Sequence, residues 1–247
     1  MRHLGDCCAA EAALPPIYTG AGGLVYDALC RDDDCGVPEL AASLRDAGAS
    51  TVIELGAGSG RITLPLLRTG FRVVAIDLSS TLLGLLTRRA AEQGLTASLD
   101  VVHADVLDDA LGLPRADAVL IGTSTISIFD MAGRRRCLRA MNNLLAPGGA
   151  AVVELYEVAP DAPAVGPVPL GVSGSFTEDL RWDEGLRTSV VTLAGQTYES
   201  TTHLLTPRLL EADLREVFGP RCRVRTSRQP IAAGRWNTQL VVDEVAA

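Results

Sequence analysis

Between residues 37 and 156, short aliphatic runs alternate with stretches of helical pattern, and this alternation constrains the fold more than any other feature. Gly, Pro or Asp bounds each run, as is typical of buried strands. Strands that alternate with helices form a mostly parallel sheet covered on both faces, so we expect an α/β fold. The predicted strands are Thr51–Leu55, Arg72–Ile76, Leu99–His103, Ala116–Ile121 and Ala150–Tyr156, with helices Ile62–Leu67, Thr81–Gln93 and Met131–Leu145 between them.

The alternation ends after residue 157. Residues 158–173 are rich in Pro, Gly and Ala and predict a loop, whereas 186–193 and 198–205 mix polar and apolar positions, as strands with exposed faces do. We therefore expect a small antiparallel insert. The elements expected after it are a helix over Pro207–Phe218 with Thr206 as N-cap, and closing strands near Arg221–Thr226 and Asn237–Glu244.

These patterns predict three parts of the chain. Residues 1–36 would form a cap segment, residues 37–157 and 206–247 the α/β domain, and residues 158–205 a β-rich insert that faces the substrate.

The composition excludes several classes of function. All basic residues of the 247-residue chain are arginine, which excludes a P-loop and a lysine Schiff base. The net charge of −8 argues against a nucleic-acid partner, because a phosphate-binding groove needs a basic surface. The sequence thus favours a small or peptidic partner, and nothing in its periodicity indicates an oligomeric state.

The cysteines and histidines indicate no metal centre. Six cysteines are scattered without a C-x-x-C pair, and no cluster of Asp, Glu and His resembles a metal site. With no signal-peptide pattern and no apolar run of 18 residues, we expect a cytoplasmic protein with reduced thiols and no membrane span.

A glycine-rich loop follows the first predicted strand. It reads Glu54-Leu55-Gly56-Ala57-Gly58-Ser59-Gly60-Arg61 and opens a helix, the position where α/β sheets bind nucleotides. Glycines at alternate positions let the backbone turn tightly and approach a ligand. Because a dinucleotide fingerprint needs glycine where Arg61 stands, a nicotinamide-dependent oxidoreductase is disfavoured.

Three acids flank this loop. Asp77 ends the second strand, where a carboxylate can accept hydrogen bonds from two ribose hydroxyls. Asp105 follows the third strand, where it can accept from an adenine amino group, and Glu54 can hold a cationic amino group. Alternatively, Asp77 and Asp105 merely cap the helices that follow.

The loop, both acids and Leu145-Ala146-Pro147-Gly148-Gly149 resemble the class I S-adenosylmethionine-dependent methyltransferases. The resemblance implies sheet order 3-2-1-4-5-7-6 with an antiparallel seventh strand, and S-adenosylmethionine as cofactor, leaving as S-adenosylhomocysteine. It also implies that glycines of the loop lie against the methionine part, Asp77 against ribose and Asp105 against adenine. The implied cofactor-binding residues are Glu54, Gly56, Ala57, Gly58, Gly60, Arg61, Asp77, Leu78, Asp105, Val106 and Gly122, with Tyr18 and Tyr26 closing over the cofactor as tyrosines do in similar small-molecule N-methyltransferases.

Candidate acceptor residues lie beyond the cofactor motifs. Thr123, Ser124 and Thr125 follow the fourth strand, where a parallel sheet opens its crevice; the alternative is a helix cap, which Asp130 alone could supply. His203 is the candidate base, although a lone strand histidine is more often structural. Core packing is the alternative for Tyr26. Tyr156 and Glu157 end the fifth strand and are further candidates, Tyr156 for catalysis and Glu157 for substrate binding.

Two narrower resemblances concern the acceptor. The insert and Tyr198–Phe218 resemble the amino-sugar N,N-dimethyltransferases of natural-product pathways. The blocks from Gly58 to Leu67 and from Gly122 to Ser127 look still more like the methyltransferases of daptide-type ribosomal peptide (RiPP) biosynthesis, which dimethylate an amine at the carboxyl end of a modified peptide. The leading expectation is N-methylation of such an amine; amino-sugar N-methylation, a small O-methyltransferase and a non-catalytic module are the alternatives.

Overall fold

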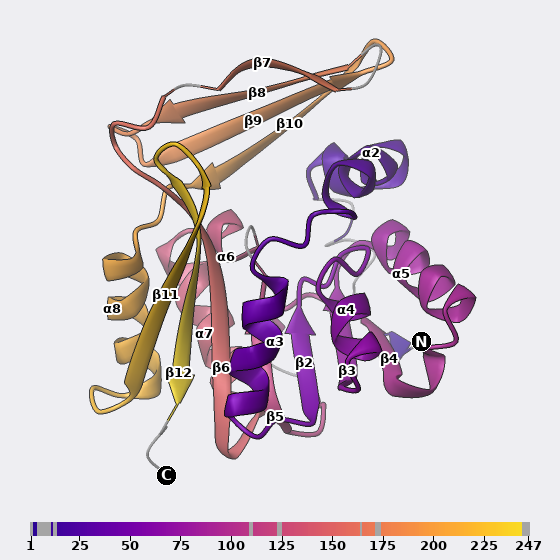
Figure 1. The fold of residues 1–247 in the computed structure, drawn as a ribbon, viewed down its shortest axis with the longest axis vertical. Helices are drawn as coiled ribbons and strands as arrows, with labels where there is room; N and C mark the ends of the chain where they lie inside the picture. The colour runs from indigo at the N-terminus through magenta and orange to yellow at the C-terminus, as the bar shows by residue number, and fades with distance from the viewer. Residues whose placement is uncertain are drawn as a thin grey trace.

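The main sheet has the predicted order. The computed structural model describes residues 2–3, 11, 14–108, 111–122, 125–163, 165–170 and 174–243. Its large sheet runs β1-β4-β3-β2-β5-β6-β12-β11, with β12 antiparallel to β6 (Figure 1). Apart from the two-residue β1, this is 3-2-1-4-5-7-6, which confirms the predicted fold class. The strands are β1 (Arg2–His3), β2 (Thr51–Leu55), β3 (Arg72–Asp77), β4 (Leu99–His103), β5 (Ala116–Ile121), β6 (Leu145–Val158), β11 (Arg223–Ala232) and β12 (Arg235–Asp243).

Helices cover both faces of this sheet because successive strand residues point to opposite sides. Val52 belongs to one core cluster, with Leu44 of α3 and Leu86 of α5, whereas the next residue, Ile53, belongs to the other, with Met141 of α7. The helices are α3 (Val37–Asp46), α4 (Thr63–Arg68), α5 (Ser80–Glu92), α6 (Thr125–Ile128), α7 (Met131–Leu144) and α8 (Pro207–Phe218), with a short 3-10 turn, η2, at Thr96–Ser98.

Most predicted boundaries are confirmed to within one or two residues. The Thr206 hydroxyl accepts a hydrogen bond from the Leu209 amide, so the predicted N-cap of α8 is confirmed. β6 is longer than predicted: it begins at Leu145, directly after α7, and includes the Pro-Gly-Gly segment. β11 likewise runs on to Ala232.

The predicted antiparallel insert is a separate four-stranded sheet of order β10-β9-β8-β7. The loop predicted over residues 158–173 is wrong in part, because 165–170 form a strand. This strand lies at the edge of its sheet and pairs on one side alone, where proline is tolerated. The strands are β7 (Val165–Leu170), β8 (Gly174–Arg181), β9 (Leu186–Leu193) and β10 (Gln196–His203).

An amino-terminal segment made of η1 (Pro16–Tyr18) and α2 (Gly20–Cys30) lies beside the insert sheet, over the end of the main sheet that carries the glycine loop (Figure 1). Contacts with α5 and its N-cap hold this segment: the Ser79 hydroxyl donates to the Tyr18 carbonyl, the Gly20 amide donates to the Thr81 hydroxyl at 3.0 Å, and Arg89 pairs with Asp27 at 2.5 Å. The Tyr18 hydroxyl lies 3.1 Å from the Ser200 hydroxyl of β10. The segment therefore joins the core domain to the insert.

None of the described helices is both long and apolar enough to cross a membrane.

Candidate active site

The glycine loop leaves β2 and turns under α2. The amides of Gly56 and Ala57 donate to the Ile76 carbonyl of β3, at 2.8 and 2.9 Å. Gly56 has a φ of +74°, and an added Cβ there would lie 2.5 Å from Thr125 Cγ2. Gly58, at φ +56°, lines both cavities, and an added Cβ there would only reach van der Waals distance of Leu82 Cδ1, at 4.0 Å. Both positions therefore favour glycine because of their positive φ, and Gly56 also requires it because a Cβ would clash with Thr125.

Gly60 has a different role from its neighbours. An added Cβ would lie 2.6 Å from Leu86 Cδ1 and 3.1 Å from Leu64 Cγ. Gly60 borders neither of the two central cavities described below. It therefore allows the loop to pack against α4 and α5.

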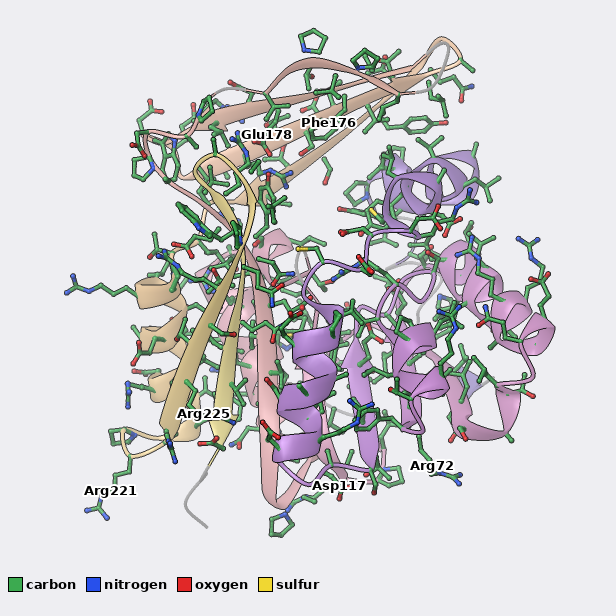
Figure 2. All side chains as sticks on the ribbon, in the orientation of Figure 1. Arg72, Asp117, Phe176, Glu178, Arg221 and Arg225 are labelled. Carbon is green, nitrogen blue, oxygen red and sulfur yellow. The ribbon has the colours of Figure 1, made fainter. Side chains whose placement is uncertain are left out.

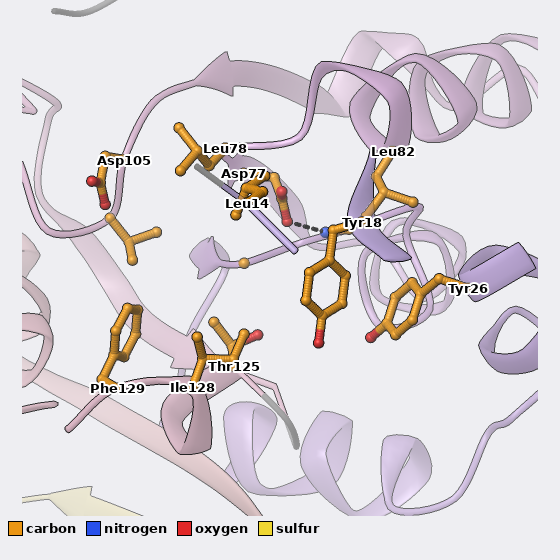
Figure 3. A pocket seen from close by; sticks show the side chains of 13 residues that line it. Leu14, Tyr18, Tyr26, Asp77, Leu78, Leu82, Asp105, Thr125, Ile128 and Phe129 are labelled. Atoms are coloured by element: carbon orange, nitrogen blue, oxygen red, sulfur yellow. Dashed lines mark hydrogen bonds between the residues drawn. The ribbon is translucent and has the colours of Figure 1, made fainter. Parts of the chain in front are cut away.

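The first cavity, of about 110 Å³, lies between the glycine loop and the amino-terminal segment. Asp77 and Asp105 lie on one side of it, with Ile128 and Phe129 opposite (Figure 3). At its end the rings of Tyr18 and Tyr26 meet edge to face, with centroids 5.1 Å apart. The lining is Leu14, Tyr18, Tyr26, Gly56, Gly58, Asp77, Leu78, Leu82, Asp105, Val106, Thr125, Ile128 and Phe129.

Backbone donors hold Asp77 in place. Its Oδ2 accepts from the Gly58 amide at 2.7 Å and its Oδ1 from the Ser79 amide at 2.8 Å. Burial raises the pKa of Asp77 above its usual value, and these hydrogen bonds offset only part of that increase. The N-cap of α5 is Ser79, whose hydroxyl accepts from Leu82, so that helix does not need Asp77 as its cap. Asp105 Oδ1 accepts from the Leu107 amide in a local turn, at 2.8 Å.

The second cavity, of about 250 Å³, meets the first at the glycine loop. The two share Tyr26, Gly56, Gly58 and Thr125. The second cavity reaches the underside of the insert and the carboxyl-terminal strands. Its remaining lining is Cys30, Asp33, Cys35, Glu54, Ala57, Ser59, Arg61, Ile62, Gly122, Tyr156, Arg187, Ile231 and Asn237.

Glu54 lies at the floor of the second cavity. Its side chain accepts from the Thr63 hydroxyl at 2.5 Å. Burial raises the pKa of Glu54 to about 8, against the lowering effects of Thr63 and Arg61. Without a cationic partner this carboxyl is therefore mostly protonated at neutral pH, and a bound cation would favour its ionised form.

Arg61 lines the second cavity and also ties the 35–36 turn to the sheet. Its Nη2 donates to Glu154 Oε2 at 2.9 Å, and its Nη1 donates to the Cys35 carbonyl at 3.2 Å. Gln239 donates to Glu154 and to the Gly36 carbonyl from the other side. Buried charges need such partners, and here the partners connect the amino-terminal turn with β6 and β12.

The acceptor candidates are separated by the structure. Tyr156 lines the second cavity and interacts with Arg235, and burial raises the pKa of its phenol, so the phenol stays protonated. His203 lines a small neighbouring cavity with Tyr156 and Arg187 rather than the second cavity. Thr123 and Ser124 lie outside the described residues. Asp130 caps α7 by accepting from the Gly133 amide.

The structure places Glu157, a predicted substrate-binding residue, outside both central cavities. Because alternate residues of β6 point to opposite faces, Glu157 points away from the side on which Tyr156 lines the cavity. Its carboxylate is held by Arg228 and, at 2.6 Å, by the Thr238 hydroxyl. It lines neither cavity.

Several lining residues had no signal in the sequence. Asn237 is the register partner of Tyr156 across β6 and β12, and Arg187 comes from the insert. Pairing of the distant strands β6 and β12 brings Asn237 to the cavity, and the placement of the insert sheet brings Arg187 there; local patterns encode neither. Among the described residues, no group of three or more His, Cys, Asp or Glu side chains could hold a metal ion.

Comparison with known proteins gives a consistent result. Residues 52–149 match the family described as the methyltransferase domain. The ribosomal RNA small subunit methyltransferase A of Cutibacterium acnes is 37% identical over 110 residues, which cover 44% of this chain and 34% of that protein. The chain thus matches about a third of the length of this curated relative.

Two solved structures extend the similarity over most of the chain. The sugar N-methyltransferase of a Streptoalloteichus species has a TM-score of 0.68 and 20% identity, with 98% of this chain and 96% of that chain covered. A glycopeptide N-methyltransferase has a TM-score of 0.56 and 25% identity, with 84% of this chain and 95% of that chain covered. The latter enzyme has also been solved with S-adenosyl-L-methionine.

Residues 52–149 are therefore a methyltransferase domain, and the described chain has the class I fold of S-adenosylmethionine-dependent methyltransferases.

Proposed function

We propose that this protein is an S-adenosylmethionine-dependent N-methyltransferase that acts on an amine of a natural product. The observation that carries the proposal is that the two cavities meet at the glycine loop. The first has the lining of a nucleoside site, with Asp77 and Asp105 as acceptors. The second has room for the methionine part and an acceptor. Similarity to a sugar and a glycopeptide N-methyltransferase supports an amine as the nucleophile.

Methyl transfer from a sulfonium is an in-line displacement, so the protein mainly aligns the nucleophile and excludes water. In the proposed arrangement, Tyr18 and Tyr26 close the cofactor side, and their contacts to α5 and β10 keep water from the junction. The acceptor amine enters beside Tyr156, whose protonated phenol orients it by a hydrogen bond. An amine attacks in its neutral form, and the proton it loses passes to water or to a nearby group.

For the acceptor itself, we propose the terminal amine of a daptide-type peptide, as the two sequence blocks suggest. The open four-stranded insert sheet supports a peptide end, since an extended ligand can lie along such a face. An amino sugar is the second candidate, which the similarity to the sugar N-methyltransferase supports.

Mass spectrometry after incubation with S-adenosylmethionine tests this function. The probes are a synthetic peptide ending in a primary amine, a nucleotide-linked amino sugar, and the hydroxyl analogue of each. We expect one amine to gain one or two methyl groups while its hydroxyl analogue stays unmodified. Methylation of the hydroxyl analogues alone would contradict N-methylation, and the absence of S-adenosylhomocysteine binding would contradict the methyltransferase proposal altogether.

The raised pKa of Glu54 gives a pH prediction for cofactor binding. If Glu54 binds the methionine ammonium as a carboxylate, then below about pH 8 cofactor binding must release the proton that Glu54 otherwise carries. The affinity for S-adenosylhomocysteine should therefore increase with pH, by up to about tenfold per pH unit between about pH 6 and 8, and then level off. Calorimetric titration at several pH values measures this, and Glu54→Gln should remove the dependence. A flat wild-type profile would contradict the role.

A further inference from the structure

Arg187 of β9 presents an uncommitted guanidinium edge to the second cavity. Its Nε donates to Glu178 Oε2 at 2.5 Å, and its Cζ lies 4.4 Å from the centroid of the Tyr156 ring. These contacts fix one edge and one face of the planar group. Within the described part of the chain, Nη1 and Nη2 form no hydrogen bond, and the side chain keeps 16% of its surface exposed. A preorganised fork of donors therefore remains free at the cavity wall.

The surroundings of Arg187 leave a net positive charge there. Glu178, on the insert sheet near the tip of the β11–β12 hairpin, is fully buried and pairs with both Arg187 and Arg235 (Figure 2). Burial raises the pKa of Glu178, but the two guanidiniums outweigh this and lower it, so the carboxylate stays ionised. One carboxylate thus faces two cations.

The second cation is buried and is bound by several partners, among them the Tyr156 phenol. Arg235 is 3% exposed and donates to Glu178, to the Pro163 carbonyl at 2.8 Å and to the Ala233 carbonyl at 3.3 Å. It does not line the second cavity, whereas Arg187 does. The excess charge of this cluster is therefore available at the free Nη edge of Arg187. The other arginine in the lining, Arg61, already pairs with Glu154.

We propose that Arg187 binds an oxyanion of the acceptor, a carboxylate or a phosphate carried by the same molecule as the amine. The inference rests on the proposed methyltransferase function and adds a substrate class to it: amines that also carry an anionic group. Two parallel N–H donors match the geometry of such a group. The same positive charge, together with the sulfonium, disfavours a protonated amine in the cavity and so favours the neutral nucleophile.

Two pairs of probes, titrated calorimetrically into the protein saturated with S-adenosylhomocysteine, test the inference. Thymidine 5′-diphosphate is compared with thymidine, and glycylglycine with glycylglycinamide. We expect one anionic probe to bind at least about tenfold more tightly than its uncharged counterpart, since a hydrogen-bonded charge pair contributes about 1.5–3 kcal/mol. The probe that binds identifies the source of the oxyanion as phosphate or carboxylate. Equal binding within both pairs would overturn the inference.

Substitutions assign the effect to this side chain. Arg187→Gln should weaken the anionic probe about 10- to 100-fold and leave the uncharged probe unchanged. Arg187→Lys, which keeps the charge but not the fork, should lie between. Arg181→Gln, an exposed arginine of the same sheet that lines neither central cavity, should have no effect. Unchanged anion binding in Arg187→Gln would overturn the assignment.

The readouts separate this inference from the proposed function. Affinity for S-adenosylhomocysteine and the thermal unfolding midpoint are measured for each variant. If the wild type binds the thioether but shows no anion preference, the inference fails while the methyltransferase proposal stands. If Arg187→Gln does not fold, the wild-type probe pairs and the lysine variant decide.

Discussion

Gly56→Ala is expected to cause a large loss of cofactor binding. The residue has a φ of +74°, where a Cβ costs about 1–2 kcal/mol. The new methyl group would lie 2.5 Å from Thr125 Cγ2 and 2.6 Å from its hydroxyl, which adds about 1–3 kcal/mol of overpacking. Because Gly56 and Thr125 line both cavities, relief of the clash must move the junction between them. Affinity for S-adenosylhomocysteine should fall about 100-fold or more.

Gly48→Ala is the matched control. Gly48 has a φ of +72°, an added Cβ would have no atom within 4 Å, and the residue borders neither cavity. It should lose stability through backbone strain alone and bind the thioether normally. Calorimetric titration, with thermal unfolding in the presence and absence of ligand, measures both effects. Equal binding by the two variants would show that the contact with Thr125 is unimportant.

Asp77→Ala is expected to weaken binding of S-adenosylhomocysteine by about 10- to 100-fold, because removing a buried charged acceptor costs about 1–3 kcal/mol. Two effects contribute. The ribose hydroxyls would lose their acceptor, and the Gly58 amide would lose the partner that holds the loop at 2.7 Å. Asp77→Asn keeps one acceptor oxygen and should therefore have the smaller effect of the two substitutions.

Asp100→Ala, at an exposed position of the neighbouring strand β4, is the control for a lost negative charge. It should bind the thioether as the wild type does. Unchanged affinity in Asp77→Ala would remove this residue from the cofactor site, whatever the behaviour of the other acids.

Several residues predicted from motifs lie together in the structure because they follow neighbouring strands of the main sheet. Gly56, Gly58 and Asp77 come together because β2 and β3 are adjacent parallel strands, and adjacent βα turns meet at one edge of the sheet. The aliphatic runs and their breaks encode this arrangement locally. Family resemblance predicted the antiparallel seventh strand, and the alternation of polar and apolar residues predicted β9.

Some predicted site residues lie outside the two central cavities, because the face to which a strand residue points depends on the tertiary structure. Glu157 follows Tyr156 in sequence yet points to the opposite face, where Arg228 and Thr238 hold it. His203 lies on a strand that reaches the site, but its ring lines a different, smaller cavity. A strand pattern predicts that side chains alternate between the two faces of a sheet, but it does not predict which face lies toward the cavity.

By itself, the sequence determined the succession of strands and helices, because hydrophobic periodicity is local. The class of cofactor and the roles of the acids that flank the glycine loop followed from the resemblance of these motifs to a known family. The tertiary structure alone decided how the second cavity is built. There, Arg187 from β9, Tyr156 from β6 and Asn237 from β12 converge on one cavity. Their charge and hydrogen bonding arise from partners on other strands, such as Glu178 of β8 for Arg187, and burial among those partners, rather than residue type, sets what each group can do.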